Sequence, residues 1–171
     1  ADVVYEAVAE GGITRFLVIF YCKDSDGYIG PIRSARIYFM SFLQEYGIYP
    51  LYAHVGGANT PGPADALGQI IRYEVKDLNQ FSIGFPVFWR DYQRLGHPVA
   101  TEHTMYSTTQ KLWEVGAKRK WVATDSAGIR WDDSFTPWKF KEGGESSGQT
   151  TKITVNFWEN QPGYLVEWNY D

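Results

Sequence analysis

Two arginines lie three residues apart in the segment Gly30-Pro31-Ile32-Arg33-Ser34-Ala35-Arg36. Proline suits the first position of a helix, because its missing N–H would have no partner there in any case. The apolar residues that follow, up to Leu43, recur with the period of a packed helix. We therefore expect Arg33 and Arg36 on one helix face, near free backbone N–H groups and the positive end of the helix dipole. Such arginines either bind an anion together, or each of them pairs with a nearby carboxylate or caps a carbonyl.

Two histidines are candidates for the same site. His54 ends an apolar run just before the pair Gly56-Gly57. Ligands of open α/β sheets bind at the carboxyl ends of strands, which makes His54 a candidate binding residue. A buried histidine with both ring nitrogens satisfied is the structural alternative. His103 lies just before an expected helix, where it either contributes to the site or fixes its loop through a backbone carbonyl.

A glycine turn near the start of the chain supplies a third charged group. Glu10 precedes Gly11-Gly12, and Arg15 follows them at the start of an apolar run. The turn is too short for a phosphate-binding loop, so a tight turn into a strand is the alternative interpretation. If this strand and the His54 strand share a sheet, their ends bring the charged groups together at one edge. The predicted ligand-binding residues are then Arg15, Arg33, Arg36, His54, His103 and Glu10.

The composition and the missing motifs exclude several classes of function. The net charge of −4 and the pI near 5.4 argue against nucleic-acid binding. No run of eighteen apolar residues exists, so nothing in the sequence spans a membrane. The sequence holds neither a His-Glu-x-x-His motif nor a Cys/His cluster, and it predicts no metal site and no cofactor. Aromatic residues make up 17% of the chain, which is typical of binding surfaces and envelope proteins, although aromatics also fill cores.

The apolar patterns also predict the elements that position these residues. Residues 2–10 fit either a strand or a short helix, and residues 77–105 are irregular enough to be functional or to carry only short elements. The more regular patterns predict strands over 13–22 and 48–55, and helices over 31–46, over 64–73 and from Ser107 or Thr108 toward Val115. The two strands and the helix between them are expected to form a right-handed βαβ unit.

The last part of the chain predicts a hairpin. Lys152 to Trp158 and Tyr164 to Tyr170 alternate in polarity around the turn Asn160-Gln161-Pro162-Gly163. The fold class that follows is α/β (α+β), with a mixed sheet, flanking helices and a β-hairpin-rich C-terminal extension.

Several separate motifs occur in the order in which a known family has them. They are Val4-Tyr5-Glu6, Glu10-Gly11-Gly12-Ile13-Thr14-Arg15, Gly30-Pro31-Ile32-Arg33-Ser34-Ala35-Arg36, His54-Val55-Gly56-Gly57 and His103-x-x-Tyr106-Ser107-Thr108. Over about residues 1–117 the chain resembles the YerB-like family of bacterial proteins of unknown function. The resemblance implies a cell-envelope protein, commonly a lipoprotein, with an N-terminal α/β domain and a smaller β-rich domain. It implies no reaction.

The resemblance also gives an expected domain division and location. Residues 1–150 are expected to form the N-terminal α/β domain, and residues 151–171 the start of a smaller β-rich domain that this chain truncates. The protein is expected outside the cytoplasm, at the cell surface or peripheral to the membrane through a lipid anchor that lies outside this chain.

Three hypotheses about function follow. The first is a module that binds an anionic cell-wall polymer or small molecule through an arginine-lined cleft. The second is a hydrolase or phosphotransferase that acts on such a ligand, with Glu10, Asp2 or Asp65 as the acidic group. The third is a structural subunit of an envelope protein assembly, in which exposed aromatic side chains make the contacts.

Overall fold

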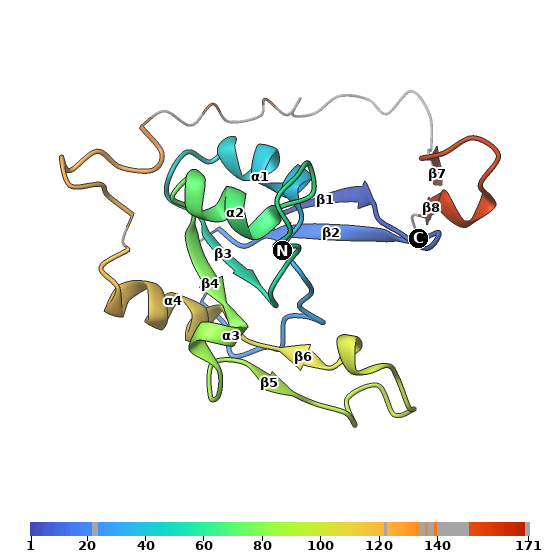
Figure 1. Cartoon of the computed structure of the whole chain (residues 1–171), viewed down its shortest axis with the longest axis horizontal. Helices are drawn as coiled ribbons and strands as arrows, with labels where there is room; N and C mark the ends of the chain where they lie inside the picture. Colours follow the sequence, from blue (N-terminus) through green and yellow to red (C-terminus); the bar gives the residue numbers. More distant parts are fainter. Residues whose placement is uncertain (22–23, 122, 134–135, 137–138, 140–150, 170–171) are drawn as a thin grey trace. The chain divides into compact units, whose positions relative to one another are not determined.

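The computed structural model describes residues 1–21, 24–121, 123–133, 136, 139 and 151–169 (Figure 1). These residues divide into two compact units. The first combines residues 1–21 with the described part of 137–171, and the second is formed by the described part of 22–136. Both helices and strands are present, so the expected mixed α/β class is confirmed. The expected domain division after residue 150 stays a prediction.

The first unit consists of two antiparallel hairpins. Strand β1 (Val3–Val8) pairs with β2 (Thr14–Ile19), so residues 2–10 form a strand and no helix. Strand β7 (Lys152–Asn156) pairs with β8 (Leu165–Asn169), which follows the short 3-10 helix η2 (Pro162–Tyr164). The C-terminal hairpin is thereby confirmed over the described residues; residue 170 of its expected second strand lies outside them.

Side chains of the two hairpins contact each other within this unit. The indole Nε1 of Trp168 donates to Oε2 of Glu6 at 3.1 Å, and its ring meets Phe16 edge-on at 6.3 Å between centroids. Gly163 approaches Gly12 so closely that a Cβ on Gly163 would lie 3.1 Å from the Gly12 carbonyl oxygen. The C-terminal hairpin is therefore placed against the β1–β2 hairpin by the backbone approach of η2 as well as by Trp168 of β8.

The second unit contains a parallel strand pair. Strand β3 (Leu51–His54) pairs with β4 (Lys76–Asn79), and helix α2 (Ala66–Arg72) connects them. The strand and the helix expected near these positions are confirmed, but the partner expected for β3 was wrong. The strand of residues 14–19 pairs with β1, because the tight glycine turn at residues 11–12 favours the antiparallel neighbour.

The segment of residues 29–35 is extended, which corrects the helix expected from residue 31. The N–H of Ile29 donates to the carbonyl of Ser107 at 2.9 Å, and the N–H of Ile32 donates to Met105 at 2.8 Å. These backbone bonds attach the first half of the segment to the strand around residues 105–107.

The second half of this segment attaches to the chain just after β3. The N–H of Val55 donates to the carbonyl of Arg33 at 3.0 Å, and the N–H of Ala35 donates to Gly56 at 2.8 Å. Backbone groups that bond to neighbouring segments cannot make the i to i−4 bonds of a helix. Tertiary pairing therefore overrides the helical pattern of the sequence here.

Helix α1 begins only where this pairing ends. It spans Ile37–Gln44, and Arg36 is its N-cap residue in an extended conformation, with φ −130° and ψ 142°. Side chains alternate between the two sides of an extended segment, so residues 33 and 36 lie on opposite sides. The expectation that Arg33 and Arg36 share a helix face was therefore wrong.

The irregular region 77–105 carries several short elements. They are α3 (Gln80–Ile83), β5 (Trp89–Arg90) and the 3-10 helix η1 (Thr101–His103), and the region leads into β6 (Met105–Tyr106). Strands β5 and β6 pair antiparallel. Helix α4 (Thr109–Lys118) follows and confirms the expected helix.

The expected N-cap of α4 is also confirmed. Thr108 precedes the helix in an extended conformation, and its side-chain oxygen accepts from the N–H of Lys111 at 3.2 Å. One of the free N–H groups of the first turn is thereby satisfied.

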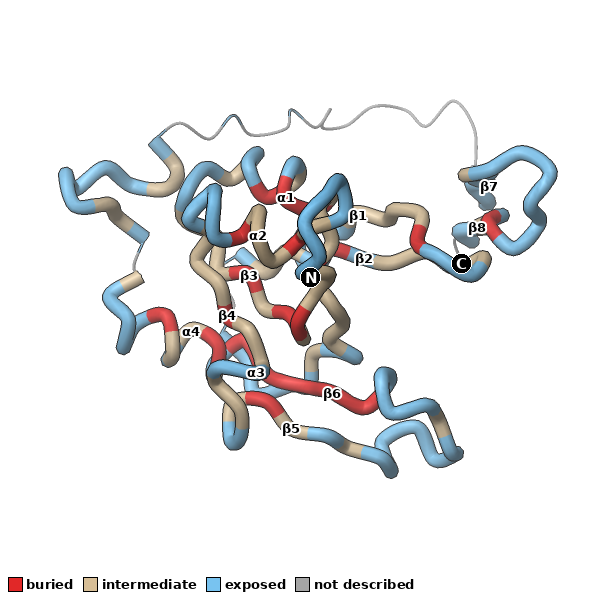
Figure 2. Tube along the Cα trace, viewed as in Figure 1, coloured by how far each residue is buried: buried red, intermediate tan, exposed pale blue. Residues whose placement is uncertain are grey.

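The core of the second unit lies between the strands and α4 (Figure 2). Its fully packed members are Leu78, Phe88, Met105 and Leu112. Ala53 also packs against this cluster, whereas its strand neighbours Tyr52 and His54 are buried on the other face of the strand. Among the described residues, no helix combines the length and apolar character needed to cross a bilayer.

His54 connects the two parallel strands. Its side chain is 1% exposed; Nδ1 lies 2.8 Å from the carbonyl oxygen of Gly56, and Nε2 bonds to Oδ1 of Asp77. Both partners are hydrogen-bond acceptors, and each of them faces one ring nitrogen. A buried ring with these two bonds supports the turn after β3.

We expect Gly30→Ala to destabilise the second unit. Gly30 has φ +143°, and a Cβ there would lie 2.7 Å from the Met105 carbonyl oxygen and 2.8 Å from the Tyr106 ring. Gly62→Ala is the matched control, because Gly62 has φ +146° but no atom within 4 Å of a Cβ. Urea unfolding should show a free energy lower for Gly30→Ala than for Gly62→Ala by about 1–3 kcal/mol. If both variants lowered the free energy of unfolding equally, the close packing of Tyr106 against Gly30 would be contradicted.

We expect His54→Leu to lower the free energy of unfolding by about 2–3 kcal/mol, because it leaves the carboxylate of Asp77 and the carbonyl of Gly56 without their donor. Asp77→Asn should cost less, since its amide oxygen still accepts from the ring. Chemical denaturation of the three proteins measures both effects. A His54→Leu protein as stable as the parent would show that these bonds do not support the fold.

Candidate functional site

Arg33 and His103 form the polar pair on which a binding site can be built. Nη1 of Arg33 lies 3.2 Å from Nδ1 of His103. A guanidinium group only donates, so Nδ1 of His103 is the acceptor in this bond and the ring's own proton is on Nε2. The pair therefore presents N–H donors from both side chains.

Two separate elements hold the pair in place. Arg33 lies on the extended segment 29–35, whose backbone is bonded on both sides. His103 lies in η1, and hydrogen bonds from Arg90 stabilise this turn. Nη1 of Arg90 donates to the carbonyl of Thr101 at 2.6 Å and to Oγ1 of Thr104 at 3.1 Å. The hydroxyl of Tyr106 adds a bond of 3.2 Å to the carbonyl of His103 itself.

The charge of Arg33 is not balanced by an ion pair within the described part of the chain, where its hydrogen-bond partner is His103. Arg15 and Arg130, by contrast, have carboxylate partners. Arg15 lies 2.9 Å from Oε1 of Glu10, and Arg130 donates to both carboxylate oxygens of Asp132 at 2.9 and 3.0 Å. The Arg130 pair also holds the pKa of the Asp132 carboxyl below its usual value, chiefly through the side-chain hydrogen bond.

Tyr106, which bonds to the η1 turn, also belongs to an aromatic cluster with Tyr28 and Trp89. The ring of Tyr28 lies 5.0 Å from Trp89 and 5.8 Å from Tyr106 between centroids. The guanidinium of Arg94 lies 4.8 Å from the Tyr28 ring, within the range of a cation–π interaction. Because Tyr106 also bonds to the His103 backbone, the cluster helps to fix the histidine.

Sequence reasoning missed the residues that hold the turn. Arg90, Arg94 and Trp89 lie in the region described from the sequence only as irregular. Their spacing fits neither a helix nor a long strand, since β5 has two residues. Only the high aromatic content of the chain hinted at such a cluster.

The remaining predicted residues have other partners in the structure. Arg36 is the N-cap residue of α1 and has its own interactions. His54 has both ring nitrogens bonded within the protein, which is the structural alternative. Arg15 and Glu10 lie in the first unit as an ion pair. The sheet edge expected to unite Arg15 with His54 was wrong, because β2 pairs with β1 and β3 with β4.

The acidic groups considered for catalysis each have a structural contact. Asp2 accepts from the N–H of Tyr21 at 2.6 Å, and Asp65 accepts from the N–H of Gly68 at 3.0 Å as the N-cap of α2. Within residues that the structure describes, no three His, Cys, Asp or Glu side chains cluster closely enough to hold a metal ion.

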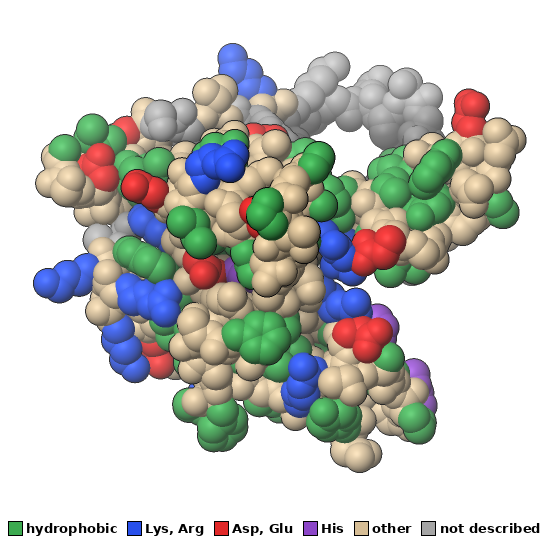
Figure 3. Space-filling model, in the orientation of Figure 1, with side chains coloured by type: hydrophobic (Ala, Val, Ile, Leu, Met, Phe, Trp, Pro, Cys, Tyr) green, Lys and Arg blue, Asp and Glu red, His purple; other side chains and the backbone are tan. Residues whose placement is uncertain are grey.

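Exposed apolar side chains are frequent on the surface of the second unit. Phe81 and Phe85 on and after α3 are 75% and 83% exposed, and Ile71 of α2 is 78% exposed. Apolar and charged side chains are interspersed on the face seen in Figure 3.

Comparison with known proteins identifies relatives of about twice the length. The chain is 30% identical over 173 residues to the Bacillus subtilis (strain 168) protein named "Putative lipoprotein YerB", covering all of this chain and 46% of that protein. The crystal structure of YerB from Bacillus subtilis superposes with a TM-score of 0.70 at 27% identity, covering 100% of this chain and 50% of that one. The chain thus spans about half the length of these relatives.

A family model matches residues 1–122, and its description is the N-terminal domain of the proteins of unknown function DUF3048. The resemblance to YerB-like proteins that the motifs indicated is confirmed. The chain therefore belongs to the DUF3048 family and contains the N-terminal domain of that family.

Proposed function

We propose that this protein binds an anionic ligand of the cell envelope, carrying phosphate or carboxylate groups, through Arg33 and His103. The observation that supports this is the hydrogen bond between Arg33 and His103, which brings two N–H-bearing side chains together. The Arg33 guanidinium bonds to an uncharged ring nitrogen, whereas the guanidinium groups of Arg15 and Arg130 pair with carboxylates. A guanidinium that has no carboxylate partner among the described residues gains charge-assisted hydrogen bonds from a bound anion.

The chemistry of the pair suits a tetrahedral or planar oxyanion. Guanidinium has five N–H donors in a fixed plane, and His103 engages one of its nitrogens. The remaining donors, with Nε2–H of His103, can bond to more than one oxygen of the same group. Because Arg90 and Tyr106 already hold the η1 turn, binding requires little ordering of the histidine.

The proposal concerns binding and does not include a reaction. The three carboxylates considered for a hydrolase or phosphotransferase, those of Asp2, Glu10 and Asp65, bond to a backbone N–H or to Arg15.

The proposed cellular location rests on the name of the Bacillus subtilis relative. The name of the Bacillus subtilis protein describes a lipoprotein, which supports an extracytoplasmic protein held at the membrane by a lipid anchor outside this chain. A cell-wall polymer or a small anionic molecule is the proposed ligand in that location. Contacts with an envelope protein assembly, the third hypothesis, stay a prediction.

We expect Arg33→Gln to weaken binding of pyrophosphate and of a glycerol phosphate oligomer at least about tenfold, because it removes the charged donor. Isothermal titration calorimetry at low salt measures the affinity. Arg33→Lys should bind between the parent and Arg33→Gln, since it keeps the charge and loses the planar donors.

Arg130→Gln is the control, because it removes the same charge from a residue that is already paired with Asp132. Its affinity should equal that of the parent protein. Equal losses in Arg33→Gln and Arg130→Gln would show that only net charge matters, and no binding by the parent protein would overturn the proposal.

A further inference from the structure

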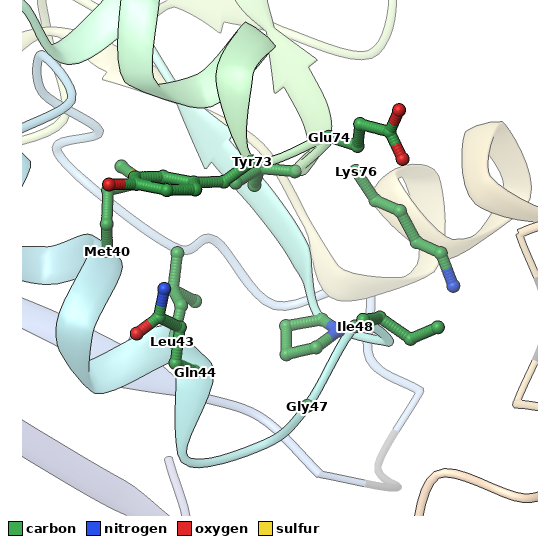
Figure 4. A pocket seen from close by; sticks show the side chains of 10 residues that line it. Met40, Leu43, Gln44, Gly47, Ile48, Tyr73, Glu74 and Lys76 are labelled. Carbon is green, nitrogen blue, oxygen red and sulfur yellow. The ribbon is translucent and has the colours of Figure 1, made fainter.

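A cavity of about 320 Å³ lies at the amino ends of the two parallel strands (Figure 4). Its walls come from the end of α1, the loop into β3 and the turn from α2 into β4. Met40 and Leu43 line it and are buried, with 3% and 7% exposure. Ile48 and Tyr73 also line it and are 67% and 51% exposed. Most of the lining is therefore apolar, and Gln44, Glu74 and Lys76 are its polar side chains.

Lys76 is the cationic residue in the lining of this cavity. Lys76 is the first residue of β4, and its Nζ lies 5.1 Å from the centroid of the Tyr49 ring. Figure 4 shows its ammonium and the Glu74 carboxylate directed away from each other, and no ion pair involves Lys76 among the residues the structure describes. Burial lowers the pKa of the Lys76 ammonium, because the charged form is partly removed from water.

We propose that this cavity binds an amphipathic carboxylate, a single anionic head on an apolar chain or ring. The apolar part packs against Leu43 and Met40 beneath the Tyr73 ring, and the carboxylate pairs with Lys76. An apolar wall alone accepts any hydrophobic molecule, whereas an ammonium at its edge selects those that carry a negative head. Cavities of this size are in the range that small ligands occupy.

This site is separate from the Arg33–His103 pair. Lys76 and the loop before Leu51 lie at the amino ends of β3 and β4. Arg33 bonds to Val55, which follows the carboxyl end of β3. The two sites therefore lie toward opposite ends of the same strand pair, and a test of one does not depend on the other.

The test is a titration of the whole chain with octanoate, followed by amide chemical shifts in NMR spectra. We expect saturable shifts at the cavity residues Gly47, Ile48 and Val75. Acetate has the head without the tail, and 1-octanol has the tail without the charge; each should bind at least about tenfold more weakly than octanoate. Equal binding of octanol and octanoate would overturn the role of Lys76, and the absence of saturable shifts would overturn the site.

Variants distinguish the contribution of the Lys76 ammonium to octanoate binding from that of the protein's net charge. Lys76→Met should weaken octanoate binding about tenfold and leave octanol unchanged, while Lys76→Arg should stay close to the parent protein. Lys118→Met is the matched control, because Lys118 is an exposed lysine in the last turn of α4. An identical loss in Lys118→Met and Lys76→Met would overturn the proposal. The spectra also report whether each variant is folded.

Discussion

The extended backbone of residues 29–35 connects the parts of the second unit. Its first half bonds to the strand at residues 105–107, and its second half bonds to residues 55 and 56. It adds backbone hydrogen bonds to both short strand pairs, β5–β6 and β3–β4, which also share the core of Leu78 and Met105. The N-terminal start of α1 depends on the same segment, since the helix begins only where these bonds end.

The extended conformation of residues 29–35 also determines which charged side chains lie next to each other. The extended backbone separates Arg33 from Arg36 and leaves Arg33 beside the η1 turn, where His103 accepts from it. At the end of β3, the same pairing encloses His54, which then bonds to Gly56 and Asp77. Among the described residues, Arg33 thus has no carboxylate partner, and His54 has both ring nitrogens bonded within the protein.

Local signals predicted the elements that depend on local interactions. The Thr108 cap, the α2 helix and the C-terminal hairpin all follow from neighbouring residues, and each is present. The helix expected from residue 31 failed because its donors found partners more than twenty residues away. His103 was a candidate from the sequence, but its pairing with Arg33, 70 positions earlier in the chain, had no local signal.

The sequence by itself determined the mixed α/β class, the family and the order of most elements, because these depend on periodicity, capping residues and ordered motifs. Only the tertiary structure decided the strand partners, the extended form of residues 29–35 and the neighbours of Arg33, His54 and Lys76. The reason is physical: a backbone donor or a charged side chain takes the best partner available in three dimensions, and that partner can lie anywhere along the chain.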